Sequence, residues 1–348
     1  MSYPIPHFTR GQVTRAGEIL IGPDTRRPEM AEALAVINHW RACHAYPINT
    51  FQATLRSRLQ KFSGQSIVAT RLKRVTSIAK KLRKNHGMAL ARMQDVGGLR
   101  AVVDSVAQVR RLEGLYKDGS LTHELVKTDD YITTPKTTGY RSLHLIYRYN
   151  NPNEDRYNGL CLELQLRTRL QHAWATAVET IGSFLNQALK SSEGPNEWLE
   201  YFNVVGNAFA LMEKCPVGSQ FIEMPPEDIY ALCVRGEQAL DVRRKLEAFA
   251  VATNAITSNK AQGNYHLIFL DAGLRTVSVK SFGQRRLDQA NEEYAAAERI
   301  ALDSPDTKQA VLVTTSSVEA LRRAYPNYFL DTRQFLSALA RIERLSGE

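Results

Sequence analysis

The sequence predicts an α+β fold in two domains, and three observations support this. Apolar residues recur at helical spacing through most of residues 28–90. Short apolar or alternating runs follow between residues 99 and 168, and strand-like runs restart after residue 260. A chain of 348 residues is also long enough for two domains that each bury a core. We expect a mixed sheet of about five strands flanked by helices, followed by a smaller domain.

The first domain, residues 1–260, is expected to surround its strands with helices. Residues 28–90 are predicted to be helical. Strands are predicted at residues 99–104, 123–128, 141–149 and 160–168, and further helices at residues 105–119, 168–189, 196–212 and 226–257. The turn-rich segment NPNEDRYNG (151–159) predicts a hairpin connection. We expect the helix over 226–257 to link this domain to the next.

The second domain, residues 261–348, is predicted to have the order ββαβα. Strands are expected at residues 264–271, 275–282 and 308–315, and helices at residues 287–302 and 317–342. This order is typical of a small α+β domain.

The net charge of +9 lies entirely in the first domain. Residues 261–348 contain 11 Lys and Arg and 11 Asp and Glu, so the first 260 residues hold 34 basic against 25 acidic side chains. A regional basic excess favours polyanionic partners such as nucleotides or nucleic acid, although a merely basic surface gives the same count.

The remaining composition indicates a cytoplasmic protein. The N-terminal segment MSYPIPHFTRGQ lacks the apolar core of a signal peptide. No apolar run approaches the roughly 20 residues that span a bilayer, so no membrane partner is expected. The four cysteines, Cys43, Cys161, Cys215 and Cys233, lie far apart without a C-x-x-C pair. We expect reduced thiols and no zinc site.

Two segments carry charges suited to a nucleotide and a metal ion. The run RLKRVTSIAKKLRK (71–84) has seven basic residues and no acid. On a helix, most of Arg71, Lys73, Ser77 and Lys81 would fall near one side and could hold a triphosphate; a solvated helical face is the alternative. In MQDVGGLR, Asp95 precedes a predicted strand, where a carboxylate is a common magnesium ligand, although a turn also explains it.

A strand and a loop complete the group of candidate residues. In LELQLRT (162–168) three leucines alternate with Glu163, Gln165 and Arg167, so one face presents polar groups, which could equally face solvent. In the loop DYITTPKTTGYRSLH (130–144), Lys136 offers a phosphate contact and Tyr140 a flat face for a base, while Gly139 allows an unusual backbone. Arg141 and His144 add donors. Together these groups favour phosphoryl-type transfer from a nucleotide to an acceptor that carries a base.

At this point the motifs resemble a known family. RLKRVTSIAKKL, QDVGGLRAVV, DYITTPKTTGYRSLH and LELQLRT are similar, in the same order, to the synthetase domain of RelA/SpoT alarmone synthetases, over about residues 60–185. The resemblance implies a nucleotidyltransferase-like mixed sheet. It also implies Mg²⁺-dependent transfer of the β,γ-pyrophosphate of ATP to a ribose 3′-hydroxyl. No histidine is followed by aspartate, so the hydrolase motif of the family is absent and only synthesis is expected.

The resemblance implies a role for each matching residue. The acids around Mg²⁺ would be Asp95 and Glu163, with Glu163 also the base for the acceptor hydroxyl. The ATP-binding residues would be Arg71, Lys73, Ser77 and Lys81. The acceptor-binding residues would be Lys136, Tyr140 and His144, supported by Gln165 and Arg167.

Two departures bear on the acceptor. Thr138 stands where guanine-nucleotide synthetases usually have asparagine, and Thr176 stands where many alarmone synthetases have glutamate. The helix LQHAWATAVET resembles the toxic small synthetases, which modify the 3′ CCA end of tRNA and stop translation. The basic excess agrees with a tRNA acceptor.

The segment YPNYFLDT (325–332) is the last unusual feature. It predicts a core aromatic cluster at a helix break, but it also resembles the C-terminal pseudo-zinc-finger domain of fused toxin–antitoxin synthetases of the CapRel type. That resemblance implies that Tyr325 and Tyr328 block the ATP site, and that a phage structural protein, typically from the capsid, releases the toxin.

Three functions therefore remain open. The first is a tRNA pyrophosphotransferase fused to its own inhibitor, acting in anti-phage defence. The second is a (p)ppGpp synthetase that uses GDP or GTP and has a regulatory C-terminal domain. The third is a non-catalytic RNA-binding sensor, although a binder would need neither Asp95 nor Glu163.

Overall fold

The computed structural model describes residues 3–23, 29–62, 64, 66–184, 189, 194–246, 265–271, 274, 276–283, 285–302, 308–314 and 332–347. Its elements follow one another in the order α1 (Arg10–Ile21), α2 (Glu29–Cys43), α3 (Ala45–Leu59), β1 (Ile67–Leu72), α4 (Val75–Lys84), η1 (Leu90–Arg92), β2 (Gly97–Val103), α5 (Val106–Lys117), β3 (Glu124–Asp130), β4 (Leu143–Arg148), η2 (Asp155–Tyr157), β5 (Cys161–Thr168), α6 (Arg169–Phe184), α7 (Asn196–Met212), η4 (Ser219–Phe221), α8 (Pro226–Leu240), β6 (Tyr265–Asp271), β7 (Thr276–Phe282), α10 (Leu287–Leu302), β8 (Lys308–Thr314) and α12 (Arg333–Ser346).

The strands form one open sheet in the order β3-β4-β5-β2-β1-β8-β6-β7. Strands β2 and β5 are parallel, and the other paired neighbours are antiparallel. This confirms the predicted α+β class and the mixed sheet. The sheet is wider than the expected five strands because the three C-terminal strands extend it beyond β1.

Residues 67–72 form a strand, so the prediction of helices throughout residues 28–90 was wrong there. The segment is rich in β-branched residues, and β1 pairs with β2 on one side and with β8 on the other. The six residue pairs with β2 satisfy one side of the strand backbone, and β8 adds one pair at Arg71, so strand pairing overrides the basic, helix-like composition. Helical periodicity resumes in α4, whose apolar side chains Val75, Ile78 and Leu82 are buried.

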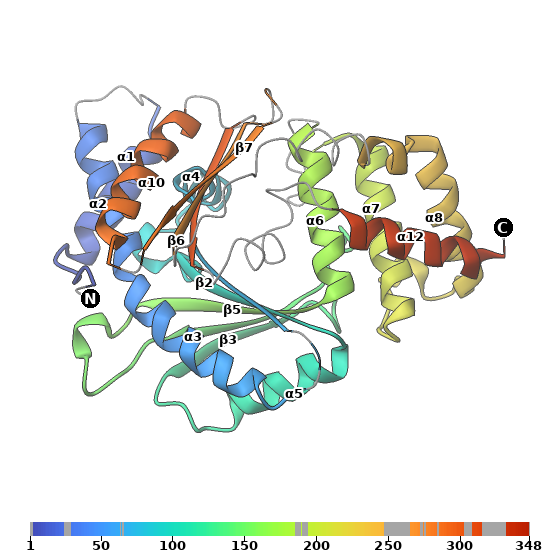
Figure 1. Ribbon diagram of the computed structural model, residues 1–348, viewed down its shortest axis with the longest axis horizontal. Coiled ribbons are helices and arrows are strands. Elements are labelled where there is room, and N and C mark those ends of the chain that lie inside the picture. Colours follow the sequence, from blue (N-terminus) through green and yellow to red (C-terminus); the bar gives the residue numbers. More distant parts are fainter. Residues whose placement is uncertain are drawn as a thin grey trace.

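Two apolar cores lie at different places along the chain. The larger core packs α1–α5 against the sheet and includes the three leucines of β5, Leu162, Leu164 and Leu166. The second core joins α6, α7 and α8 to α12 through side chains such as Phe202 and Phe335. Figure 1 shows these four helices together at the end of the molecule away from α1 and α2.

The C-terminal residues have the predicted element order but divide between two places. Strand β8 adjoins β1, with β6 and β7 beyond it, and α10 packs on these three strands, whereas α12 packs against α6 and α8. Figure 1 shows α10 and α12 far apart. The domain boundary at residue 261 and the zinc-finger-like class of this region stay predictions. Of the expected linker, α8 covers residues 226–240, and residues 247–264 lie outside the described residues. No helix in the described part of the chain is long and apolar enough to cross a membrane.

Candidate active site

One face of the sheet brings two predicted site residues, Arg71 and Glu163, into register on either side of Gly98. Arg71 of β1 lies opposite Gly98 of β2, and Gly98 lies opposite Glu163 of β5. Directly opposed residues project from the same face, so the Arg71 and Glu163 side chains flank a position that has none. A Cβ atom at Gly98 would come within 3.3 Å of the Glu163 carbonyl oxygen. Glycine therefore keeps the space between the guanidinium and the carboxylate clear.

Asp95 lies just before β2 and is held by two lysines. Its Oδ2 is 2.9 Å from the Nζ of Lys73, and its Oδ1 is 2.9 Å from the Nζ of Lys81. Burial alone would raise the pKa of Asp95, but the two ammonium groups outweigh burial and hold the pKa below its ordinary value; the nearby charge of Glu163 opposes them. The two predicted acids are thus close enough to repel each other.

Glu163 and His144 form the other charged pair of the site. The Nδ1 of His144 lies 2.8 Å from Oε1 of Glu163, and both side chains are mostly buried. Burial would lower the pKa of His144, but Tyr140 and Glu163 outweigh it and raise the pKa to about 9. Burial likewise opposes the charge of Glu163, yet His144, Lys73 and Arg71 hold its pKa well below the ordinary value. Both members of the pair are therefore charged at neutral pH.

The Tyr140 hydroxyl is the centre of a hydrogen-bond network. It lies 2.8 Å from the Nε2 of His144 and accepts hydrogen bonds from Gln165 Nε2 at 3.1 Å and Arg167 Nη2 at 2.7 Å. Arg100 in turn donates to Gln165 Oε1 at 2.9 Å. The ring of Tyr140 is only 4% exposed, so the exposed stacking platform expected at this position is not present in this conformation.

The polar face of β5 is enclosed. Gln165 and Arg167 are buried, and the side chain of Glu163 is 21% exposed, which rules out the alternative of a solvent-facing side. Buried polar groups need partners, and the network around Tyr140 supplies them. The strict alternation of LELQLRT thus separates a leucine core on one side from the candidate site on the other.

The loop before β4 is fixed by close backbone contact with α7. Gly139 has φ of +84°, and a Cβ there would lie 2.8 Å from the Phe202 carbonyl oxygen. This confirms the unusual backbone expected at Gly139. The buried Arg141 donates to the carbonyl oxygens of Ile132, Gly206 and Pro216 and to Asn207, so it anchors the loop to the fold.

The predicted ATP-binding residues come from three elements. Arg71 belongs to β1 and Lys73 to the connection that follows, whereas Ser77 and Lys81 belong to α4. The prediction that they share one helical face was therefore wrong. Lys73 and Lys81 nevertheless meet at Asp95. Tyr325 and Tyr328 lie outside the described residues.

Two side chains of the site were not predicted. Tyr131 lies against the ring of His144 at 5.3 Å between centroids, and the Lys136 ammonium stands 4.4 Å above the Tyr131 ring. Tyr131 lies in the quoted loop, so an aromatic beside a lysine was visible there. Arg100 gave no sequence signal, because its partner Gln165 is 65 residues away.

Asp95 and Glu163 would suit a magnesium ion that takes its remaining ligands from outside the protein. Among the described residues, no group of three His, Cys, Asp or Glu side chains could hold a metal ion. Mg²⁺ commonly takes one or two protein carboxylates and completes its shell with phosphate oxygens and water. Asp95 and Glu163 match that donor set, and Lys73, Lys81 and Arg71 supply positive charge suited to phosphates.

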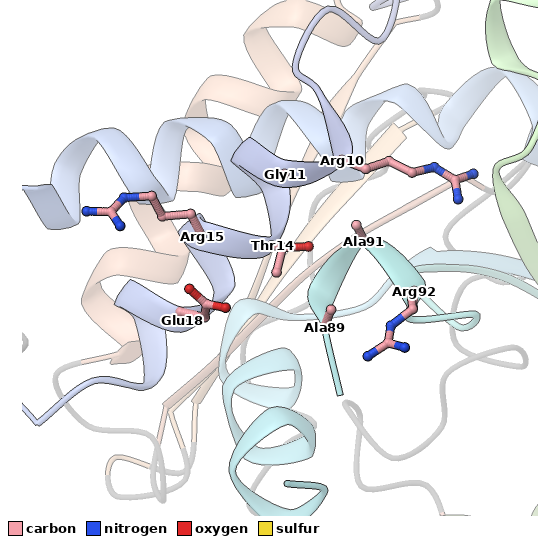
Figure 2. A pocket seen from close by; sticks show the side chains of 8 residues that line it. All are labelled: Arg10, Gly11, Thr14, Arg15, Glu18, Ala89, Ala91 and Arg92. Carbon is pink, nitrogen blue, oxygen red and sulfur yellow. The ribbon is translucent and has the colours of Figure 1, made fainter. Parts of the chain in front are cut away.

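A cavity of about 450 Å³ lies next to this region, between α1 and η1. Figure 2 shows Arg15 and Glu18 at one edge and Arg10 and Arg92 at the other, with Thr14, Ala89 and Ala91 between them; the Arg10 and Arg15 side chains point in opposite directions. The 3₁₀ helix η1 ends three residues before Asp95. The cavity is therefore separate from the acids but adjoins the segment that carries one of them.

Comparison with known proteins identifies the central part of the chain. Residues 70–182, about a third of the chain, match the family model described as the region found in RelA / SpoT proteins. The chain is 31% identical over 134 residues to GTP pyrophosphokinase YwaC of Bacillus subtilis, covering 38% of this chain and 58% of the relative. It is 33% identical over 114 residues to GTP pyrophosphokinase YjbM of the same organism, and this match covers 31% of this chain and 52% of the relative. The resemblance predicted for residues 60–185 is confirmed at the level of this family region.

These matches are partial. The chain spans about half the length of the curated relatives it matches. Among solved structures, a GTP pyrophosphokinase family protein from Streptococcus pneumoniae aligns with 60% of this chain and 98% of its own, at 20% identity and a TM-score of 0.43.

Proposed function

We propose that the protein is an ATP pyrophosphotransferase of the RelA/SpoT type that acts in the cytoplasm. The observation that carries the proposal is the placement of Arg71, Gly98 and Glu163 in one row, with Asp95 held by Lys73 and Lys81 beside it. Two carboxylates surrounded by lysine and arginine side chains suit a nucleoside triphosphate with its metal ion. The family match over residues 70–182 supports the same activity.

In this proposal the lysines exchange one anion for another. Lys73 and Lys81 pair with Asp95 in the structure, and they turn to the phosphates when ATP binds. Arg71 and Ser77 contribute a fork of donors and a hydroxyl from the adjacent elements. Bound Mg²⁺ would neutralise charge on the transferred group, with Asp95 and Glu163 as its protein ligands.

The transfer joins the acceptor 3′-hydroxyl oxygen to the β-phosphorus of ATP and releases AMP. The hydroxyl proton must leave, and Glu163 is the proposed base. Because its pKa is held well below the ordinary value by His144, Glu163 accepts a proton poorly while that ion pair is intact. Proton transfer therefore requires the His144 contact to loosen when the acceptor enters.

We propose the 3′ end of tRNA as the acceptor. The basic excess of the first 260 residues, the arginine-edged cavity beside η1 and Thr138 in the acceptor loop support this choice. Lys136 and Tyr131 offer a cation and an aromatic ring in the acceptor loop, whereas Tyr140 is buried and supports the site through its hydroxyl group. The second candidate is GDP or GTP, which the names of the relatives YwaC and YjbM favour.

We further propose that the C-terminal region regulates this activity. Tyr325 and Tyr328 would block the ATP site, and a phage structural protein would relieve the block, as in a toxin fused to its antitoxin. Contacts of β8 and α10 with residues 71–75 support a link between this region and the ATP site. An appended inhibitor acts at high effective concentration, so modest contacts suffice, and a trigger must bind the open form better.

A labelling experiment tests the proposal. The full chain carrying Tyr325→Ala and Tyr328→Ala is supplied with Mg²⁺, ATP labelled in the γ-phosphate and deacylated tRNA, GDP or GTP. Label on tRNA that is lost with the terminal adenosine supports the tRNA acceptor, and label on GDP or GTP alone supports the second candidate. Glu163→Gln in the same background separates catalysis from the non-catalytic sensor, which would bind tRNA without transfer.

A further inference from the structure

The N-terminus of α4 is bound by a carboxylate from the C-terminal region. Oε1 of Glu298, on α10, accepts a hydrogen bond from the backbone N–H of Val75 at 3.0 Å. The cap residue of this helix, Arg74, makes no capping hydrogen bond with its own side chain. Glu298 therefore supplies, from 223 residues away, the capping contact that a local side chain usually makes.

Glu298 is held in place by a buried cluster. Arg41 of α2 donates to both of its carboxylate oxygens, at 2.5 and 3.2 Å, and the Tyr294 hydroxyl donates to Oε1 at 2.9 Å. Arg41 also donates to the Tyr294 hydroxyl at 2.6 Å. The side chains of Arg41 and Glu298 are only 2% and 7% exposed. Charges buried to this degree are costly unless paired, so the cluster holds α2, α4 and α10 in one arrangement.

Two more contacts join the C-terminal strands to the same segment. Arg71 pairs through its backbone with Val313 of β8, and Arg74 Nη1 donates to Gln309 Oε1 of β8 at 2.7 Å. Ala69 of β1 shares an apolar core with Ile268 of β6 and Val311 of β8. Residues 69–75, which lead into the predicted ATP helix, are thus contacted at four positions by the C-terminal region.

We propose that Glu298 is a positioning residue for ATP binding: it fixes the start of α4, and with it Ser77 and Lys81, relative to Asp95. This rests on the proposed function, in which α4 binds ATP. The C-terminal region then contributes to a competent ATP site as well as regulating it.

An opposite role for Glu298 would be occlusion. Helix N-termini commonly bind phosphate, so a carboxylate there could act as a competitor of ATP. The burial of the cluster favours positioning, because displacement of Glu298 would leave the Arg41 guanidinium buried without its partner, at a cost that a single phosphate contact would not offset. The two roles predict opposite changes in the KM for ATP.

The test compares four full-length proteins in the Tyr325→Ala, Tyr328→Ala background. They are the parent, Glu298→Gln, the double variant Arg41→Met with Glu298→Leu, and Glu292→Gln as the control at an exposed glutamate of α10. The double variant removes both buried charges and so should recover thermal stability lost in Glu298→Gln. It still leaves the Val75 N–H without Glu298.

We expect the KM for ATP to rise about fivefold in both Glu298 variants, because loss of one cap destabilises the start of a helix by about 1 kcal/mol. The KM for the acceptor should not change. Amide hydrogen exchange at Val75–Ile78 should be faster in both variants than in Glu292→Gln. A double variant with recovered stability and an unchanged KM for ATP would reduce Glu298 to a structural role, and a lowered KM would establish occlusion. If the parent transfers nothing from ATP, the proposed function fails, and the exchange rates alone still decide whether Glu298 fixes α4.

Discussion

The imidazole of His144 joins Glu163 to Tyr140, with Nδ1 2.8 Å from the Glu163 carboxylate and Nε2 2.8 Å from the Tyr140 hydroxyl. The pair is strongest while both members are charged, because the attraction between the two charges is then added to the hydrogen bond. Because the pKa of His144 is about 9 in the folded protein and 6.5 in its unperturbed state, its contribution is fully present below pH 6.5 and is lost as the pH rises through about 9. The depressed pKa of Glu163 adds stability above pH 4.5, which is lost as the pH falls.

This predicts a specific pH dependence of thermal stability. The difference in Tm between the wild type and His144→Gln should be largest near pH 5–6.5 and should shrink between pH 7 and pH 10. His86→Gln, at an exposed histidine, is the control and should show no such trend. A His144→Gln difference that stays constant from pH 6 to pH 10 would show that the imidazole is neutral in the folded protein.

A second prediction concerns the contact of Gly139 with α7. Gly139→Ala adds a Cβ 2.8 Å from a backbone oxygen at φ of +84°, whereas Gly87→Ala meets nothing within 4 Å at φ of +82°. Both variants carry the cost of positive φ, roughly 1–3 kcal/mol. Only Gly139→Ala should lower the free energy of unfolding by more than that amount. It should also raise the acceptor KM, because the added Cβ forces the loop to move away from α7. Equal losses of unfolding free energy in the two variants would contradict this account of the loop.

A third prediction is that residues 1–260 alone are less stable than the full chain. Truncation removes β8 from the edge of β1, takes away Glu298 and Tyr294, the partners of Arg41, and exposes the helical core around Phe202 that α12 covers. Chemical denaturation of both proteins measures the difference, and an unchanged midpoint would contradict it.

A fourth prediction tests the arginine-edged cavity as part of the tRNA surface. Arg15→Glu combined with Arg92→Glu should weaken tRNA binding. The binding should also depend less on salt: the slope of log K against log salt concentration should fall by about 1 for each phosphate that is no longer neutralised. The KM for GDP or GTP should not change. Arg344→Glu is the control: it makes the same change of charge at an exposed position of α12, away from the cavity. Unaltered tRNA binding by the double variant would exclude the cavity from the interface.

The sequence was most informative where local patterning and tertiary structure agree. The alternation of LELQLRT predicted both faces of β5, and the turn-rich segment at 151–159 predicted the β4–β5 connection. Most element bounds, including those of α7 and α10, follow directly from periodicity. Asp95 and Glu163 were predicted from short motifs, and the structure brings them to the same part of the sheet.

The failures have a common physical cause, which is long-range contact. Strand β1 was predicted as helix because its residues run directly into the helical pattern of α4, whereas its pairing with β2 and, at Arg71, with β8 is decided by tertiary contact. The Arg41–Glu298 pair and the Glu298 cap on α4 are equally non-local. The buried state of Tyr140 follows from Arg167 and Gln165 on another strand. Such contacts leave no periodic signal in a single sequence.

The most direct test of the central claim is transfer of the γ-phosphate label from ATP by the full-length Tyr325→Ala, Tyr328→Ala protein, with and without Glu163→Gln. The account predicts a labelled 3′ end on deacylated tRNA, dependent on Mg²⁺ and abolished by Glu163→Gln. Absence of transfer to tRNA, GDP and GTP alike, by a protein that is folded and binds ATP, would contradict it.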